Sequence, residues 1–138
     1  MLVKTYGSAV QGIHATLITV EVDIGGGFGY IHVGLPDGAV RESRDRIFTA
    51  FRNTNLHLPR KKITVNMAPA DIRKEGSAYD LTIAVGIVAA DDKLDAELVS
   101  KYLIMGELSL DGSVLPIRGA LPIAIEARKQ GFKGFILP

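Results

Sequence analysis

The sequence predicts a two-layer α/β (α+β) fold, in which a mixed sheet packs against helices. Two patterns support this prediction. Alternating, β-rich runs open the chain at residues 3–10 and 15–24, and later strand-like runs are interleaved with stripes of apolar residues at helical spacing. The 138 residues contain no internal repeat, low-complexity tract or linker. They suit one domain, which would bury roughly two thirds of its unfolded surface.

A glycine-rich segment, Gly25–Gly29, separates the second strand from a strand-like run at residues 30–35. Because glycine tolerates the backbone angles of tight turns, we expect a hairpin turn here. A phosphate-binding loop would need a strand-to-helix junction and a Gly-Lys-Ser/Thr ending, which this segment lacks. No Walker A motif occurs in the chain, so we do not expect it to bind or hydrolyse nucleotide by itself.

The first helix is predicted to start after Pro36, with Asp37 as its N-cap. Its apolar residues share one stripe, which predicts a buried face made of Val40, Ile47, Phe48 and Phe51. Four arginines are expected on the remaining surface, at Arg41, Arg44, Arg46 and Arg52. A solvated face of mixed charge is the simpler interpretation. The functional alternative is that Arg41, Arg44 and Arg52 contact nucleic-acid phosphates or a neighbouring subunit.

A strand at residues 61–67 leads through residues 68–75 to a second helix. Ser77 is followed three residues later by Asp80, ahead of an apolar run. This is an acidic capping box, so the helix is expected to begin at about Ser77. Gly76 allows a sharp turn before it, and the amides of a first helical turn favour an anion or a developing oxyanion. The segment Lys74–Leu81 is therefore either a plain helix start or the loop of an acyl-transfer site.

The rest of the chain predicts five more elements. A short helix is expected at residues 96–101, followed by strands at 103–110 and 113–117. Asp111-Gly112 between them is a strong hairpin signal. A third major helix containing Leu121 ends before Gly131, and a last strand covers residues 132–137.

Composition excludes several functional classes. There is no cysteine, hence no disulfide, thiolate nucleophile or Cys-based zinc site, and the three histidines, His14, His32 and His57, form no metal-binding pattern. With 16 basic and 15 acidic residues, net charge gives no general attraction to nucleic acid. The N-terminus does not resemble a signal peptide, and no apolar run is long enough to span a bilayer. We therefore expect a cytoplasmic protein that does not enter the membrane.

Three motifs together resemble a known family. They are Gly34-Leu35-Pro36-Asp37 leading to Arg41-Glu42-Ser43, then Lys74-Glu75-Gly76-Ser77-Ala78-Tyr79-Asp80-Leu81, and finally the segment Gly106–Ile117. Over essentially the whole chain they resemble the N-terminal domain of the ComM/YifB proteins, which are bacterial Mg-chelatase-like AAA+ proteins. The chain also ends abruptly in an apolar Phe-Ile-Leu-Pro. We therefore expect residues 1–138 to be a single domain excised from a longer protein.

The same domain resembles the Lon protease domain, which has the ribosomal protein S5 domain 2-like fold. The Lon helix entrance reads Lys-Asp-Gly-Pro-Ser-Ala-Gly, and its later hairpin ends in Val-Leu-Pro-Ile followed by Gly-Gly-Leu-Lys. In this alignment Ala78 takes the place of the nucleophilic serine and Leu121 takes the place of the catalytic lysine. The resemblance therefore implies an inactive Lon-like domain. The helix-entrance motif Lys74, Glu75, Gly76, Ser77 and Asp80 would remain as architecture.

The resemblance also implies a role. In the ComM/YifB family a separate AAA+ module carries the ATPase, assembles as a ring and, in ComM, drives DNA branch migration in natural transformation. The domain would then be an accessory part that supports ring assembly and contacts DNA or a partner, by analogy with the related inactive Lon-like domain of RadA, which also belongs to a ring-forming DNA recombination protein. ATP and Mg²⁺ would bind only to the AAA+ module, with no cofactor or metal in this segment.

Two alternatives stay open. The first is a peptidase with a shifted dyad, in which Ser77 is the nucleophile and Lys74 the base. The second is a part of a metal chelatase, which rests on the family label alone. A Ser-His-Asp site cannot be tested from sequence, because triads assemble in space.

Overall fold

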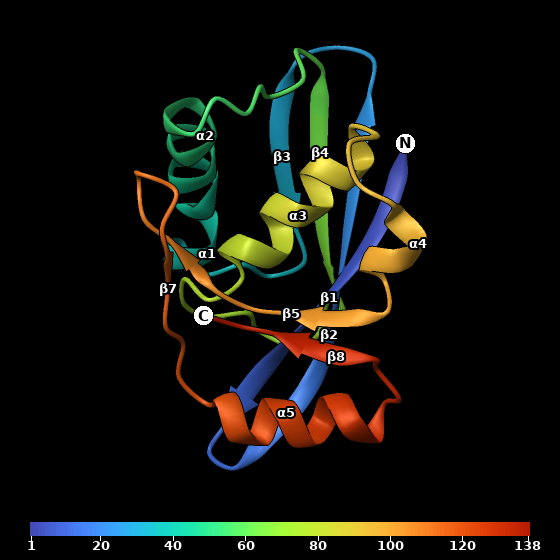
Figure 1. The fold of residues 1–138 in the computed structure, drawn as a ribbon, viewed down its shortest axis with the longest axis vertical. Coiled ribbons are helices and arrows are strands. Elements are labelled where there is room, and N and C mark those ends of the chain that lie inside the picture. The colour runs from blue at the N-terminus through green and yellow to red at the C-terminus, as the bar shows by residue number, and fades with distance from the viewer.

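In a computed structural model that describes all 138 residues, the chain forms a six-stranded sheet, a separate two-stranded hairpin and five helices (Figure 1). The strands of the main sheet lie in the order β3-β4-β2-β1-β5-β8. They are β1 (Leu2–Gln11), β2 (His14–Gly25), β3 (Gly29–Val33), β4 (Lys62–Ala68), β5 (Tyr102–Ile104) and β8 (Gly134–Ile136). The hairpin pairs β6 (Glu107–Leu108) with β7 (Val114–Leu115), and the helices are α1 (Gly38–Arg41), α2 (Ser43–Asn53), α3 (Asp80–Ala90), α4 (Ala96–Val99) and α5 (Ala120–Lys129). The mixed sheet packed with helices confirms the predicted fold class.

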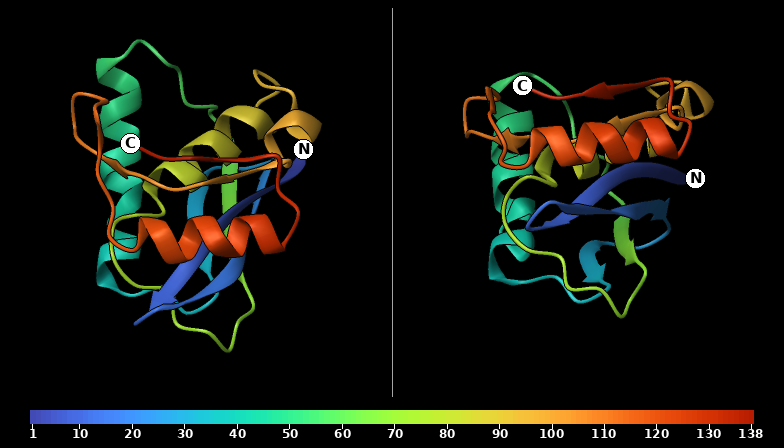
Figure 2. Two further views of the ribbon diagram at one scale, coloured as in Figure 1. Left: turned by 60° about the horizontal axis from the view of Figure 1, so that its bottom comes forward. Right: turned by 90° about the horizontal axis from the view of Figure 1, so that it is seen from below.

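Helices lie against both sides of the β1–β2 pair. Thr5 and Gly7 of β1 face α3, since the Thr5 hydroxyl donates to the Thr82 carbonyl oxygen at 2.9 Å. Tyr6 alternates with them along the strand and instead contacts Phe132, just beyond α5, with ring centroids 5.3 Å apart. Figure 2 shows α5 beside the end of the β1–β2 hairpin. The second view agrees with the packing of α5 against β1, β2 and β8.

The core lies between the sheet and α3. The inward residues of β2 and β4 are fully buried, among them Val20, Val22 and Val65. Helix α3 is apolar on nearly all sides, because the sheet, α2 and α4 all pack on it. A Cβ on Gly86 would lie 2.7 Å from Cγ2 of Val22, so glycine at this position lets α3 approach the sheet. None of the helices has the length and apolarity needed to cross a membrane.

The predicted hairpin between residues 15–24 and 30–35 is wrong. β2 and β3 do not pair, because β4 lies between them, antiparallel to β2 and parallel to β3. The glycine-rich segment 25–29 therefore carries the chain across the position that β4 later fills. The predicted strand at 103–110 is also corrected. It divides at Gly106 into β5 of the main sheet and β6 of the small hairpin.

Other local predictions are confirmed. The carboxylate of Asp37 caps the first helix by accepting from the Val40 N–H at 2.8 Å. That helix is broken after Arg41 into α1 and α2, and Val40, Ile47 and Phe51 of the predicted stripe are buried. Asp111-Gly112 lies in the turn between β6 and β7, although both strands are only two residues long.

Candidate functional site

The segment Lys74–Leu81 borders a cavity of about 670 Å³, which we call the entrance cavity. The loop 75–79 forms one wall, and residues 116–118, Asp37 and Glu107 contribute to the others. Four polar side chains of the lining make no hydrogen bond or ion pair within the chain, namely Ser77, Tyr79, Glu107 and Arg118. A hydroxyl, a carboxylate and a guanidinium can together bind a polypeptide main chain or a charged side chain.

The predicted capping box at the start of the second helix does not form. Helix α3 begins at Asp80, three residues later than expected, and Tyr79 at the N-cap position makes no side-chain hydrogen bond to the helix. Ser77 contributes its main-chain carbonyl, which accepts from the Asp80 N–H at 3.2 Å. The first turn of α3 is held instead by Gly106, whose carbonyl accepts from the Leu81 N–H at 3.0 Å and whose N–H donates to the Ala78 carbonyl at 2.8 Å.

Asp80 is a buried ion-pair partner and not a helix cap. Its carboxylate accepts from Nε of Arg46 at 2.6 Å and from Nη2 of Arg46 at 2.9 Å, and it also accepts from the Leu108 N–H at 3.0 Å. Burial raises the pKa of Asp80, an effect opposed by the Arg46 side chain and the Leu108 N–H. The hydrogen bond with Asp80 raises the pKa of Arg46 in turn. This forked pair joins α2, α3 and β6.

Arg46 corrects the prediction that all four arginines of the first helix decorate its surface. Its side chain is only 17% exposed. The sequence carries a signal for this, because Arg46 lies three residues after Ser43 and four before Ala50, both of which are buried. That spacing places Arg46 beside the buried stripe of the helix.

Lys74 is fully buried, and its amine is used to hold the chain together. Nζ donates to the carbonyl oxygen of Gly34 at 2.6 Å and to that of Pro69. Burial lowers the pKa of Lys74, although the charge of Asp71 acts in the opposite direction. Two main-chain hydrogen bonds also join Lys74 to residues 35 and 37. They connect the segment that follows β3 to the segment that precedes α3.

Asp37 ties the same loop from the other side. Besides capping α1, its carboxylate accepts from the Gly76 N–H at 3.1 Å. Gly76 has a φ of +84°, a left-handed conformation that glycine adopts at little cost. The helix-entrance motif is thus fixed by Asp37, Lys74 and Asp80, while Glu75 is exposed and lies 3.3 Å from Arg73.

The two positions that align with the Lon dyad are placed differently. Ala78 is half-buried and lines the entrance cavity, where it presents only a methyl group. Leu121 lies in the first turn of α5, is 71% exposed and is not part of the cavity lining. Ser77 does line the cavity, whereas the amine of Lys74 is bonded to main-chain carbonyls.

The three arginines proposed to contact DNA or a subunit lie on α1 and α2. Arg41 and Arg52 are exposed and form no ion pair. Arg44 lies 3.3 Å from Asp45, and its guanidinium carbon is 4.9 Å from the ring centroid of Phe48. No cluster of three or more histidine, aspartate or glutamate side chains has the geometry to hold a metal ion.

The sequence matches a known protein family over most of its length. The profile described as subunit ChlI of Mg-chelatase matches residues 20–138. The chain is 42% identical over 130 residues to competence protein ComM of Haemophilus influenzae, covering 94% of this chain and 26% of ComM. It is 46% identical over 126 residues to the uncharacterized protein YifB of Escherichia coli, covering 91% of this chain and 25% of YifB.

A weaker similarity extends to proteases. Lon protease 1 of Bacillus subtilis is 28% identical over 141 residues, which cover 96% of this chain and 18% of the protease. The chain spans about a quarter of the length of ComM and YifB. The chain therefore belongs to the Mg-chelatase-like ChlI family, as its resemblance to the ComM/YifB proteins predicted.

Proposed function

We propose that this chain is a non-catalytic accessory domain of a Mg-chelatase-like AAA+ ATPase of the ComM type. In this role it supports assembly of a ring and contacts DNA or a partner protein in DNA recombination during natural transformation. The AAA+ module of the same cytoplasmic protein would be its first partner, and that module would bind ATP and Mg²⁺. Support comes from membership of the ChlI family and from 42% identity to a protein named for competence.

The main support for this proposal is that the charged residues at the start of α3 are bonded to other parts of the fold. Lys74 binds main-chain carbonyls and Asp80 binds Arg46, so both charged groups join separate segments of the fold. A Ser–Lys mechanism needs a neutral amine within hydrogen-bond reach of the hydroxyl. Ala78 offers a methyl group to the cavity, and Leu121 is directed to solvent. This arrangement favours a scaffold over a peptidase.

The alternative is a peptidase that uses Ser77 and Lys74. Two features favour it, since Ser77 lines the entrance cavity and burial lowers the pKa of Lys74. Against it, the lysine amine would have to leave the carbonyls of Gly34 and Pro69 before it could accept a proton from a hydroxyl. Each carbonyl left unpaired in a buried site costs about 1–3 kcal/mol.

Peptide hydrolysis separates the two functions. The chain is incubated with a mixture of fluorogenic peptides, alongside Ser77→Ala and a matched control, Ser113→Ala, in an exposed turn. We expect none of the three proteins to release product above the buffer rate. Hydrolysis that Ser77→Ala abolishes and Ser113→Ala preserves would establish the peptidase and overturn the accessory role.

The proposed assembly and DNA-binding roles are tested by two further measurements. Light scattering gives the molar mass of the chain, and fluorescence anisotropy gives its affinity for DNA at low and high salt. We expect salt-dependent DNA binding, assembly beyond a monomer, or both, because exposed cations that bind phosphates lose affinity as salt rises. A chain that stays monomeric and binds no DNA at low salt would contradict both roles for this domain.

A further inference from the structure

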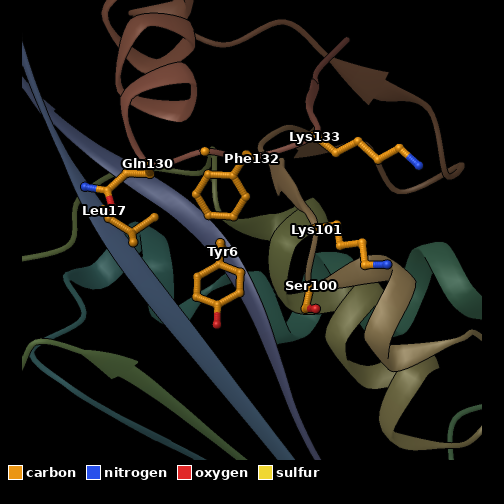
Figure 3. Close-up of a pocket in the computed structure, with 8 residues that line it drawn as sticks. Tyr6, Leu17, Ser100, Lys101, Gln130, Phe132 and Lys133 are labelled. Atoms are coloured by element: carbon orange, nitrogen blue, oxygen red, sulfur yellow. The ribbon is translucent and has the colours of Figure 1, made fainter.

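A second cavity, which we call the lysine pocket, lies where β5 and β8 begin and α5 has just ended (Figure 3). Its volume is about 480 Å³, within the range of small-molecule sites. Tyr6 and Leu17 contribute from the β1–β2 pair, Ser100 and Lys101 from the chain before β5, and residues 130–133 from the segment between α5 and β8. The lysine pocket shares no lining residue with the entrance cavity.

Parallel strand pairing brings two lysines together at this pocket. Tyr102 of β5 pairs with Gly134 of β8, so Lys101 and Lys133 immediately precede two neighbouring strands. The Lys133 N–H donates to the Lys101 carbonyl at 2.8 Å, which fixes their backbones side by side. Figure 3 shows both side chains extending in the same direction, away from the ribbon.

The charges of these lysines are not neutralised within the chain. The five ion pairs of the structure all lie elsewhere, and neither Lys101 nor Lys133 has a carboxylate oxygen within 4.0 Å. On the adjoining helix α5, the carboxylate of Glu126 accepts from the Gln130 amide at 2.8 Å. Two adjacent, unpaired cations favour an anion between them.

Aromatic rings lie beside these cations. Tyr6 and Phe132 are both half-buried, and their rings are tilted by 58° with centroids 5.3 Å apart. Figure 3 shows the two rings one above the other on the side of the pocket away from the lysine amines. The Gln130 amide nitrogen is held by Glu126, which leaves the amide oxygen free to accept a hydrogen bond. Ring surface and a free acceptor thus line the cavity, and the side chains of Lys101 and Lys133 extend outward from its edge.

We propose that the lysine pocket binds a nucleotide unit of single-stranded nucleic acid. The base would stack on Tyr6 or Phe132, and the phosphates would contact Lys101 and Lys133, which is how proteins hold unpaired strands. A duplex is disfavoured because its bases are already stacked and paired. This inference rests on the proposed DNA contact and places it on a different surface from Arg41, Arg44 and Arg52.

The test measures anisotropy of a labelled 15-nucleotide oligothymidine with the 138-residue chain at several salt concentrations. Lys101→Gln with Lys133→Gln is compared with Arg41→Gln with Arg52→Gln, which removes the same charge from the other surface. All four residues are exposed, so both double variants should fold, and circular dichroism checks this. We expect the lysine variant to lose at least tenfold in affinity and to lower the salt slope by about 1.4, which is 0.7 for each phosphate contact. The arginine variant should change little.

Two further arms test the kind of ligand. Tyr6→Leu and, as a second variant, Phe132→Leu should weaken oligothymidine binding about 5-fold or more, because a stacked base contributes about 1–3 kcal/mol. Neither should weaken competition by inorganic tripolyphosphate. A duplex of equal length should bind more weakly than the single strand.

The outcomes are distinct. If the arginine variant loses binding and the lysine variant does not, the inference fails while the DNA-binding role stands. If the ring variants have no effect and tripolyphosphate competes as well as the oligonucleotide per phosphate, the site is a phosphate site and the nucleotide assignment is wrong. If the unmodified chain binds no oligonucleotide at 50 mM salt, both the inference and the proposed DNA contact fail.

Discussion

The entrance of α3 and the lysine pocket use charged residues in opposite ways. At the entrance, Lys74 and Asp80 are buried, and each is bonded to a group far away in the sequence. At the pocket, Lys101 and Lys133 are exposed and unpaired. Charges with internal partners hold the fold together, whereas charges without them are available to a ligand. The motif that most resembles an active site is therefore the more structural of the two regions.

The largest expected effect comes from breaking the buried pair. Asp80→Asn should lower the free energy of unfolding by about 3–5 kcal/mol, because it leaves the Arg46 charge without a partner in a mostly buried site. The control is Glu75→Gln, which removes the exposed Arg73–Glu75 pair and should cost about 0–1 kcal/mol. Urea denaturation measures both. Similar losses in the two variants would mean that the buried Arg46–Asp80 pair contributes no more to stability than the exposed Arg73–Glu75 pair.

A smaller effect is expected from His32, because its ring, if protonated, would be a charge in a mostly buried site without a partner. Both ring nitrogens of His32 are buried without a hydrogen-bond partner, and burial, followed by the charges of Arg41 and Lys74, lowers its pKa to about 4. The unfolded chain takes up a proton near pH 6.5 and the folded chain only near pH 4, so stability should fall as pH drops through this window. A pKa shift of one unit corresponds to about 1.36 kcal/mol, and we discount this value because the ring is partly exposed to solvent. We therefore expect the free energy of unfolding to fall by about 2 kcal/mol as pH drops through this window.

His32→Phe should remove that pH dependence, whereas His57→Gln, in an exposed loop, should leave it unchanged. Thermal melts from pH 7 to pH 4 supply the comparison. An unaltered slope in His32→Phe would show that another group is responsible.

The smallest effect is expected at the lysine pocket. Lys101→Gln with Lys133→Gln should change the free energy of unfolding by no more than about 0.5 kcal/mol, because exposed side chains without partners contribute little to stability. Removing two adjacent like charges also removes the repulsion between them. A loss above 1 kcal/mol in urea denaturation would place these lysines among the structural charges and erase the contrast between the two regions.

The sequence predicted what depends on neighbours along the chain. The first two strands, the Asp37 cap and the buried stripe of the first helix all follow from short-range patterns. Prediction from sequence failed where the structure depends on contacts between segments that are far apart in the chain. β4 inserts between β2 and β3, and Arg46 bonds to the carboxylate of Asp80, which the sequence assigned to a capping box.

The candidate sites were predicted only in part for the same reason. Lys74 was recognised as part of a motif, but its partners are main-chain carbonyls of residues 34 and 69, which no side-chain pattern reveals. The lysine pocket was missed because Lys101 and Lys133 meet only after α5 has brought β8 alongside β5. Tyr6, which lines the same pocket, comes from the opposite end of the sequence.

The most direct test of the account compares Lys74→Met with Ser77→Ala in urea denaturation at pH 7. We predict that Lys74→Met loses about 2 kcal/mol or more, because the carbonyls of Gly34 and Pro69 lose their donor. Ser77→Ala should stay within about 0.5 kcal/mol, because its hydroxyl caps nothing. The reverse result would be an unchanged free energy of unfolding in Lys74→Met and a loss of about 1 kcal/mol in Ser77→Ala, which is the usual contribution of a helix cap. That result would contradict this interpretation, because Ser77 would then cap the helix and the Lys74 amine would be available for catalysis.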